Sequence, residues 1–200
     1  MAFSIRLKIL FLLGFVLALN TAQSQNLNEF SPYSEGVTED ILYESEFRYK
    51  DFLFTGLFAV KSETDGTHIY LMSKMGFTLV EAILKENETI WIKTAPFLEK
   101  NQLKKQLATD LRLLTQSPLK FGSIKKRTEN GIKIKFNDGE KAFFKVENGA
   151  IVSAKTKGFL KPVKTKISYL GSSTNGVPNE IVMTKTLVDA EIKLQLHENK

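Results

Sequence analysis

The sequence predicts a mainly β (α+β) protein, with about ten or eleven strands in one curved antiparallel sheet and a single main helix packed on it. Three observations lead to this fold class. Short runs of alternating apolar and polar residues fill most of the chain, turn signals separate these runs, and one segment, residues 99–116, changes to a helical spacing of leucines. Alternation with a period of two is typical of strands with one buried face, whereas a spacing of three to four is typical of an amphipathic helix.

The clearest part of the sheet is residues 52–81, which contain three extended runs. In the first run Phe52, Phe54, Phe58 and Val60 alternate around Gly56, and an Asp-Gly and a Met-Gly pair separate the runs. Such turns between alternating runs predict antiparallel strands joined by tight connections. Gly56 lies in the middle of the first run, and a glycine there marks a bend, a bulge or a close backbone approach. We therefore expect the sheet to be strongly curved.

The remaining elements follow from the same signals. A first strand is predicted before the central meander, and the helix is expected to end at Ser117-Pro118, because a residue before proline is pushed out of the helical region. After the helix, turns containing Asn-Gly or Asp-Gly recur and predict two or three hairpins. Strands outside the meander are expected at 41–50 and 89–94, from 124 onward, and at 163–169, 180–185 and 187–196.

The first residues have the layout of a secretory signal peptide, with basic residues, a short apolar run at 9–19 and small residues before residue 25. That run is shorter than the roughly 20 residues of a membrane-spanning helix, so cleavage is expected. The sequence thus predicts a signal peptide at 1–24, a tether or short capping segment at 25–40 and one domain at 41–200. The chain has no cysteine, hence no lipid-bearing cysteine after the signal, and is expected to be exported and soluble in the periplasm.

Charge is distributed unevenly. The whole chain carries +6, residues 25–66 hold three bases and nine acids (3 − 9 = −6), and residues 118–170 hold thirteen bases and four acids (13 − 4 = +9). One interpretation is that the stretch Lys125 to Lys166 faces an anionic membrane surface. The other is that these lysines, which alternate with apolar residues, form the solvated side of the sheet. Nucleic acid is not expected as a partner.

The sequence offers no constellation for catalysis. There are two histidines and no cysteine, and neither a Gly-x-Ser-x-Gly nucleophile motif nor a phosphate-binding glycine loop occurs. Two isolated histidines do not give the clustered ligands of a metal site. We therefore expect a protein that is not an enzyme and that requires no metal or cofactor.

Several segments together resemble the LolA/LolB-like superfamily. These are the Phe-x-Gly strand at 54–56, Val60-Lys61, Ile69-Tyr70-Leu71, the segment 76–81 (Gly-Phe-Thr-Leu-Val-Glu), and the leucine-rich helix around Asp110-Leu111-Arg112. The resemblance extends over roughly residues 41–196. It implies an unclosed half-barrel of antiparallel strands whose concave apolar side is covered by helices. It also implies a function in carrying lipoproteins or lipids, with the acyl chains held in the cavity.

The sequence departs from the best-known members of that superfamily. It lacks the cysteine that anchors the acceptor protein, and the loop 63–67, the nearest equivalent of a loop on which that acceptor exposes an apolar residue, is polar. The first difference favours a soluble periplasmic form, and the second disfavours the acceptor role. The soluble carrier has an arginine that holds its lid helices down, and the resemblance assigns this latch to Arg48.

The functional prediction is a cavity between sheet and helix, with the helix as its lid. It rests on three observations: the helix stripe is rich in leucine, the strands facing it are rich in aromatic residues, and the chain has an export signal but no set of catalytic residues. The alternative is a non-catalytic envelope protein in which the same residues form a filled core and only the surface contacts a partner. The residues expected to line the cavity are Phe54, Phe58, Ile69, Leu71, Leu79, Trp91, Leu103, Leu107, Leu111, Leu114, Ile167 and Ile192.

Overall fold

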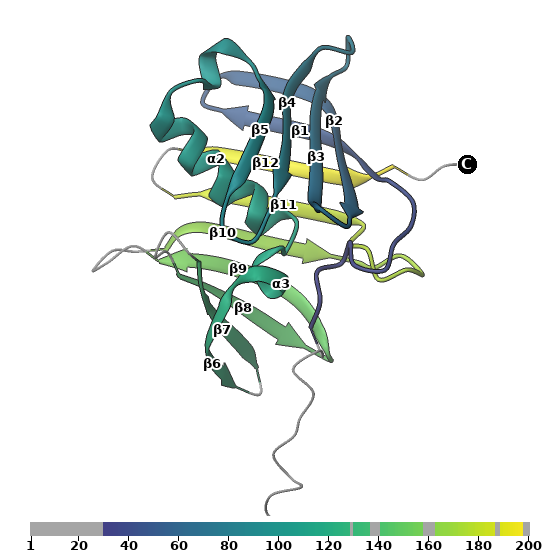
Figure 1. The fold of residues 1–200 in the computed structure, drawn as a ribbon, viewed down its shortest axis with the longest axis vertical. Coiled ribbons are helices and arrows are strands. Elements are labelled where there is room, and N and C mark those ends of the chain that lie inside the picture. Colours follow the sequence, from purple (N-terminus) through teal and green to yellow (C-terminus); the bar gives the residue numbers. More distant parts are fainter. Residues whose placement is uncertain (1–29, 129, 137–140, 158–162, 187–188, 198–200) are drawn as a thin grey trace, which may run out of the picture. The chain divides into compact units, whose positions relative to one another are not determined.

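The strands pair antiparallel in one sheet of twelve, in the order β5-β4-β3-β2-β1-β12-β11-β10-β9-β8-β7-β6 (Figure 1). The computed structural model describes residues 30–128, 130–136, 141–157, 163–186 and 189–197. The strands are β1 (Ile41–Tyr49), β2 (Phe52–Glu63), β3 (Gly66–Ser73), β4 (Thr78–Leu84), β5 (Thr89–Thr94), β6 (Ser123–Thr128), β7 (Gly131–Lys135), β8 (Lys141–Glu147), β9 (Ala150–Lys157), β10 (Val163–Leu170), β11 (Glu180–Lys185) and β12 (Ala190–Leu196). The helical elements are η1 (Pro96–Leu98), α2 (Asn101–Leu114) and α3 (Pro118–Phe121).

The first strand pairs with the last, which leaves β5 and β6 as the two edges of the sheet. The segment containing η1, α2 and α3 follows β5 and precedes β6, and Figure 1 shows α2 in front of the middle strands. The predicted fold is therefore confirmed: an open, curved antiparallel sheet with one main helix on its concave face. The strand number is twelve rather than ten or eleven, because each turn-bounded run after residue 123 forms a strand of its own.

The core lies on the face of the sheet that α2 covers. Pairing places Tyr43 opposite Phe58 and Ile167 opposite Met183, so their side chains share this face. Burying each such side chain stabilises the fold by about 1.5–3 kcal/mol. The largest fully buried side chains are Tyr43, Phe144, Ile69, Leu84, Leu111, Leu113, Ile132, Ile134, Ile167, Ile181, Met183 and Leu194.

Gly56 lies at a close backbone approach, one of the three features that its place inside an aromatic strand indicates. A Cβ atom there would lie 2.0 Å from the carbonyl oxygen of Met72 on β3. The register between β3 and β4 also shifts between Leu71 and Met72. The chain therefore bends where three strands approach closely, and no side chain larger than hydrogen fits at Gly56 without a shift of the backbone.

The lysines of β7 lie on the solvated side of the sheet. Ile132 and Ile134 are buried, whereas Lys133 and Lys135 between and after them are exposed. This alternation fits the second interpretation of the basic stretch, in which lysines cover the outer face of an antiparallel sheet.

Part of the segment expected to be a tether packs against the folded domain. Pro32, Tyr33 and Ser34 are buried, and the backbone N–H of Tyr33 donates to Oε1 of Gln116 at 3.3 Å. The expected signal peptide, residues 1–24, lies outside the described residues, so the domain boundaries stay a prediction. No helix in the described part of the chain is long and apolar enough to cross a bilayer.

Candidate functional site

The C-terminal half of α2 is fixed to the rest of the protein by tyrosine hydroxyls. The hydroxyl of Tyr169 on β10 donates to the carbonyl oxygen of Leu113 at 2.6 Å, and the hydroxyl of Tyr33 donates to that of Leu114 at 3.1 Å. The last carbonyls of a helix have no partner within the helix, and these hydroxyls satisfy two of them. Burial raises the pKa of both tyrosines well above the ordinary value, so the hydroxyls stay protonated and able to donate.

Charged side chains add to this attachment. Asp110 of α2 forms an ion pair with Lys185 of β11, and both side chains are largely buried. Arg112 reaches the β4–β5 turn, where it donates to the carbonyl oxygens of Lys85 at 2.9 Å and Glu88 at 2.7 Å. Asp110 therefore lies on the buried side of α2, together with Leu111 and Leu114. Its distance of three residues from Leu107 was the signal that could have shown this.

Arg48, the predicted latch, lies elsewhere. It is exposed, on the face of β1 opposite to the buried Tyr43 and Ser45, and it pairs with Glu46 at 2.8 Å. Because side chains on a strand alternate between faces, Arg48 points away from the face that α2 covers. In this structure Arg112 is the arginine that connects the helix to the sheet.

The N-terminal half of α2 is held much less tightly. Leu103 is 43 % exposed and Leu107 is half-buried, whereas Leu111 is 2 % exposed. The helix is also shorter than expected, beginning at Asn101 rather than at residue 99, and the N-cap residue before it, Lys100, makes no side-chain capping hydrogen bond. A helix end without such a cap is less stable. Its remaining contacts are exposed ones, from Lys104 to Glu99 and from Thr94 of β5 to Glu99.

The residues predicted to line the cavity also differ in how deeply they are buried. Phe54 and Ile192 both lie opposite Phe47, and all three are half-buried, toward the turn between β1 and β2. Leu79 falls at the irregularity between β3 and β4, because Val80 takes the place opposite Leu71. Fully buried are Phe58, Ile69, Leu111, Leu114 and Ile167; half-buried are Phe54, Leu71, Leu79, Trp91, Leu107 and Ile192; Leu103 is exposed.

A cleft of about 240 Å³ lies beside α2. Trp91 is the one predicted lining residue among those that border it, together with Lys105 and Arg112 of α2, Phe121 of α3 and Phe136. Aromatic rings, basic side chains and two glutamates of the β4–β5 turn therefore border the cleft together. Such a mixed lining suits a ligand with both apolar and polar parts better than a purely apolar one.

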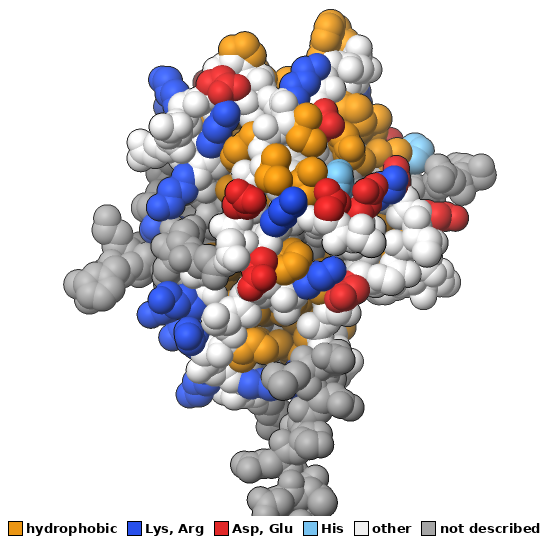
Figure 2. All heavy atoms as spheres, viewed as in Figure 1, with side chains coloured by type: hydrophobic (Ala, Val, Ile, Leu, Met, Phe, Trp, Pro, Cys, Tyr) orange, Lys and Arg blue, Asp and Glu red, His pale blue; other side chains and the backbone are white. Residues whose placement is uncertain are grey.

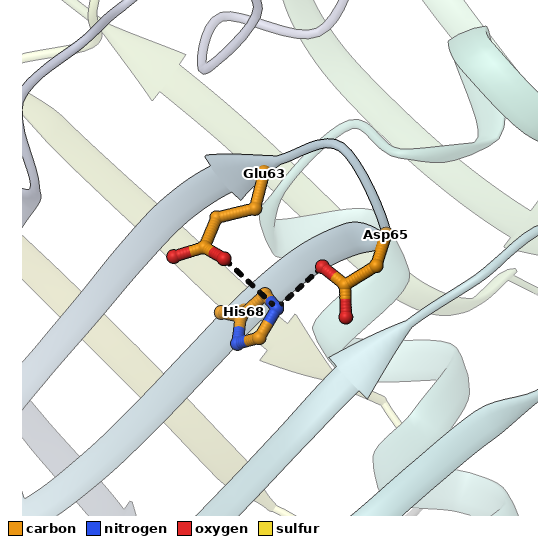
Figure 3. Close-up of side chains that lie close together, drawn as sticks. All are labelled: Glu63, Asp65 and His68. Carbon is orange, nitrogen blue, oxygen red and sulfur yellow. Dashed lines mark hydrogen bonds and ion pairs between the residues drawn. The ribbon is translucent and has the colours of Figure 1, made fainter.

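A separate cluster of titratable side chains lies at the turn between β2 and β3 (Figure 3). The Nε2 atom of His68 is 2.8 Å from Oδ1 of Asp65 and 3.7 Å from Oε2 of Glu63. The three ligand atoms lie within 4.8 Å of one another, so these side chains could hold a divalent cation. Each also has a partner already, because Lys61 binds Glu63 at 3.0 Å and the bond to His68 lowers the pKa of Asp65. Spacing alone did not indicate this cluster.

Comparisons with known proteins show which solved structures share this fold. No protein-family model and no curated protein sequence matches the chain. A domain from Vibrio parahaemolyticus, named for outer membrane lipoprotein sorting, matches with a TM-score of 0.51 and 8 % identity over 83 % of this chain and 86 % of that chain. The chain shares the fold of this domain.

Two other solved structures were also matched. A LolA superfamily protein from Nitrosomonas europaea gives a TM-score of 0.47 and 8 % identity over 80 % of this chain and 83 % of that chain. A DUF1329 family protein from Desulfovibrio piger gives a TM-score of 0.47 and 7 % identity over 82 % of this chain and 85 % of that chain. An identity of 8 % with the Vibrio parahaemolyticus domain shows a shared fold alone, so the cargo has to be argued from the site itself.

Proposed function

We propose that this protein is an exported, non-enzymatic carrier or acceptor of lipid or lipoprotein acyl chains. The observation that carries the proposal is the gradient of burial along α2 and the face beneath it. At the C-terminal end of the helix the apolar side chains are fully buried, whereas toward its N-terminal end Leu107, Phe54 and Ile192 are only half-buried. An apolar face that its own helix leaves partly exposed is suited to a ligand that is itself apolar.

The energy of such binding comes from the acyl chain. Each methylene group removed from water contributes about 0.8 kcal/mol, so a segment of six methylenes gives roughly 5 kcal/mol before the entropic cost of association. The half-buried aromatic rings of Phe47 and Phe54 supply apolar contact area at the entrance. No polar chemistry is needed for affinity.

Opening of the lid follows from the way the helix is held. Hydrogen bonds from Tyr33 and Tyr169 and the ion pair of Asp110 lie in its last turns, so α2 is expected to pivot there and to lift at its N-terminal end. The weakly buried Leu103 and Leu107 would then move away from the sheet and expose the face beneath them. This is the sense in which the helix acts as a lid.

A fluorescent fatty-acyl probe tests the proposal. We expect saturable binding by the protein recovered after export, with a change in the emission of Trp91, the single tryptophan of the chain. Phe54→Asp should weaken binding at least tenfold, because it places a charge on the half-buried apolar face. Leu57→Asp is the matched control: it lies on the same strand, is also half-buried, and faces the other side of the sheet. Equal loss in both variants, or no binding by the unaltered protein, would reject the carrier function.

The filled-core alternative also has an observation in its favour. Five predicted lining residues, among them Phe58, Ile69 and Ile167, are fully buried with no need of a ligand. If the face contracts fully around its own side chains, only the surface of the protein would meet a partner. Native mass spectrometry of the exported protein separates the two functions, because only a carrier brings lipid mass with it.

A further inference from the structure

Exposed apolar side chains gather at one end of the sheet. Ten large apolar side chains are exposed in the described residues, and eight of them belong to three regions: the β1–β2 turn, the β3–β4 turn and the segment around η1. Met75 is 85 % exposed and Phe77 is 68 % exposed in the β3–β4 turn, and Phe97 is 65 % exposed in η1. The eight are Tyr49, Phe52 and Leu53 at the β1–β2 turn, Met75 and Phe77, and Ile92, Phe97 and Leu103 around η1.

Strand pairing places these three regions at the same end. Tyr49 pairs with Phe52 at the β1–β2 turn, and Gly56 pairs with Ser73, so the β3–β4 turn extends to the same side. Val80 pairs with Thr94, which brings the end of β5, and with it η1, to that side as well. Neighbouring strands lie about 4.8 Å apart, so the two turns are roughly 10 Å from each other across the sheet. We call this set of eight residues the apolar rim.

Positive charge accompanies the apolar rim. The segments 49–53, 73–78 and 92–104 contain five lysines and two acids, a balance of 5 − 2 = +3. One of the two acids, Glu99, is already bound to Lys104 at 2.7 Å. Figure 2 shows hydrophobic side chains at the upper tips of the molecule, with Lys and Arg side chains beside them. The exposed lysines next to the rim are Lys50, Lys74, Lys93 and Lys100.

We propose that the apolar rim docks on an anionic lipid bilayer, with its tips in the interface and its lysines among the headgroups. Apolar side chains that project from several turns can enter the boundary between headgroups and acyl chains, and lysines near the surface add attraction to anionic lipids. The rim includes the N-terminal end of α2, so docking would bring the end that lifts toward the membrane. The docking surface itself is inferred from the exposure and charge of these residues. What docking would be for rests on the proposed carrier function.

The rim differs from the basic stretch that the sequence suggested as a membrane contact. Lys133 and Lys135 of that stretch stand on the outer face of β7 without exposed large apolar neighbours on their own strand. Lysines alone give attraction that salt screens, whereas the rim combines charge with apolar area. The two surfaces can therefore be separated by experiment.

Sedimentation with lipid vesicles tests the docking, using the protein recovered after export with its N-terminus verified by mass spectrometry. Vesicles of phosphatidylcholine with 30 % phosphatidylglycerol are compared with vesicles of phosphatidylcholine alone. We expect the double variant Phe77→Asp, Phe97→Asp to lower the partition coefficient at least tenfold on the anionic vesicles. Lys74→Glu with Lys100→Glu should lower it at least threefold on anionic vesicles and leave the neutral ones unchanged.

Two controls keep the result interpretable. Leu170→Asp changes an exposed apolar residue at the end of β10, outside the rim, and Lys133→Glu with Lys135→Glu changes the basic stretch; neither should alter partitioning. Absence of vesicle binding, or equal loss in the controls, would overturn the docking. Binding of the acyl probe in vesicle-free solution is measured on the same variants. Intact probe binding without vesicle binding would overturn the docking alone, and the reverse pattern would overturn the carrier function alone.

Discussion

Asp110 on α2 and Lys185 on β11 form an ion pair whose side chains are 4 % and 16 % exposed, so a charged contact joins helix to sheet inside the apolar core. Asp110→Ala would leave the ammonium group of Lys185 largely desolvated without this carboxylate. We expect a loss of about 3 kcal/mol in the free energy of unfolding, measured by urea denaturation. The double variant Asp110→Leu, Lys185→Met should recover most of this loss. A double variant as unstable as the single one would show that the charge pair is not what the core requires.

The buried tyrosines predict a loss of stability at high pH. Burial is the largest cause that raises the pKa of Tyr33, Tyr43 and Tyr169 above the ordinary value of about 10. The folded protein therefore keeps these protons where the unfolded chain releases them. The stability due to these groups is fully present below about pH 10 and is lost as the pH rises above it. Thermal unfolding between pH 8 and 12 should show this decline, and Tyr169→Phe should reduce it. A flat profile would contradict the buried hydroxyls.

The burial gradient along α2 predicts unequal effects of equal substitutions. Leu111→Ala should cost about 2–5 kcal/mol, because a fully buried leucine leaves a cavity, whereas Leu103→Ala should cost less than about 1 kcal/mol. Leu107→Asp should cost an intermediate amount, about 2 kcal/mol, since that side chain is half-buried. Hydrogen exchange should likewise be faster in the first turns of the helix than in the last. Uniform protection along α2 would argue against a lid that lifts at one end.

Gly56 predicts a strong intolerance of side chains. Gly56→Ala places a Cβ atom 2.0 Å from the carbonyl oxygen of Met72, so strands β2 and β3 must separate. We expect a loss of about 1–3 kcal/mol, as for other overpacked sites. Thr55→Ala, on the adjacent half-buried position, should change stability by less than about 1 kcal/mol. Chemical denaturation of both variants gives the comparison, and similar midpoints would mean that the sheet is not constrained at Gly56.

The cluster at the β2–β3 turn predicts a shift that can be followed by NMR. The hydrogen bond from His68 is the largest cause that lowers the pKa of Asp65. A lowered carboxylate pKa contributes stability above the ordinary value of about 3.9, and this contribution is lost as the pH falls through the folded-state pKa. His68→Ala should therefore raise the pKa of Asp65 toward its ordinary value. His197→Ala, which removes a histidine 3.7 Å from Glu44, should leave Asp65 unchanged.

Local pattern was sufficient for much of the fold. Period-two alternation placed β1, β5 and β11 at or within one residue of their observed bounds, and the leucine spacing found α2. Both succeed because the buried face of a strand or helix fixes the spacing of apolar residues that are close in sequence. The strand context of Gly56 indicated a bend, a bulge or a close backbone approach, and the contact with Met72 shows the close approach. The fold that the resemblance implied, an open antiparallel sheet with a helix on its concave side, is confirmed.

Depth and long-range partners were decided only by the tertiary structure. The sequence set Leu103, Leu107, Leu111 and Leu114 on one stripe, but the sheet covers the last two and leaves Leu103 exposed, since coverage depends on where distant strands end. The pairs between Tyr169 and Leu113 and between Lys185 and Asp110 join residues 56 and 75 positions apart. No local period records such contacts. The sequence by itself determined which side chains are apolar and at what spacing they recur. Only the folded sheet decided which of them remain exposed to a ligand or a membrane, because exposure depends on packing between distant segments.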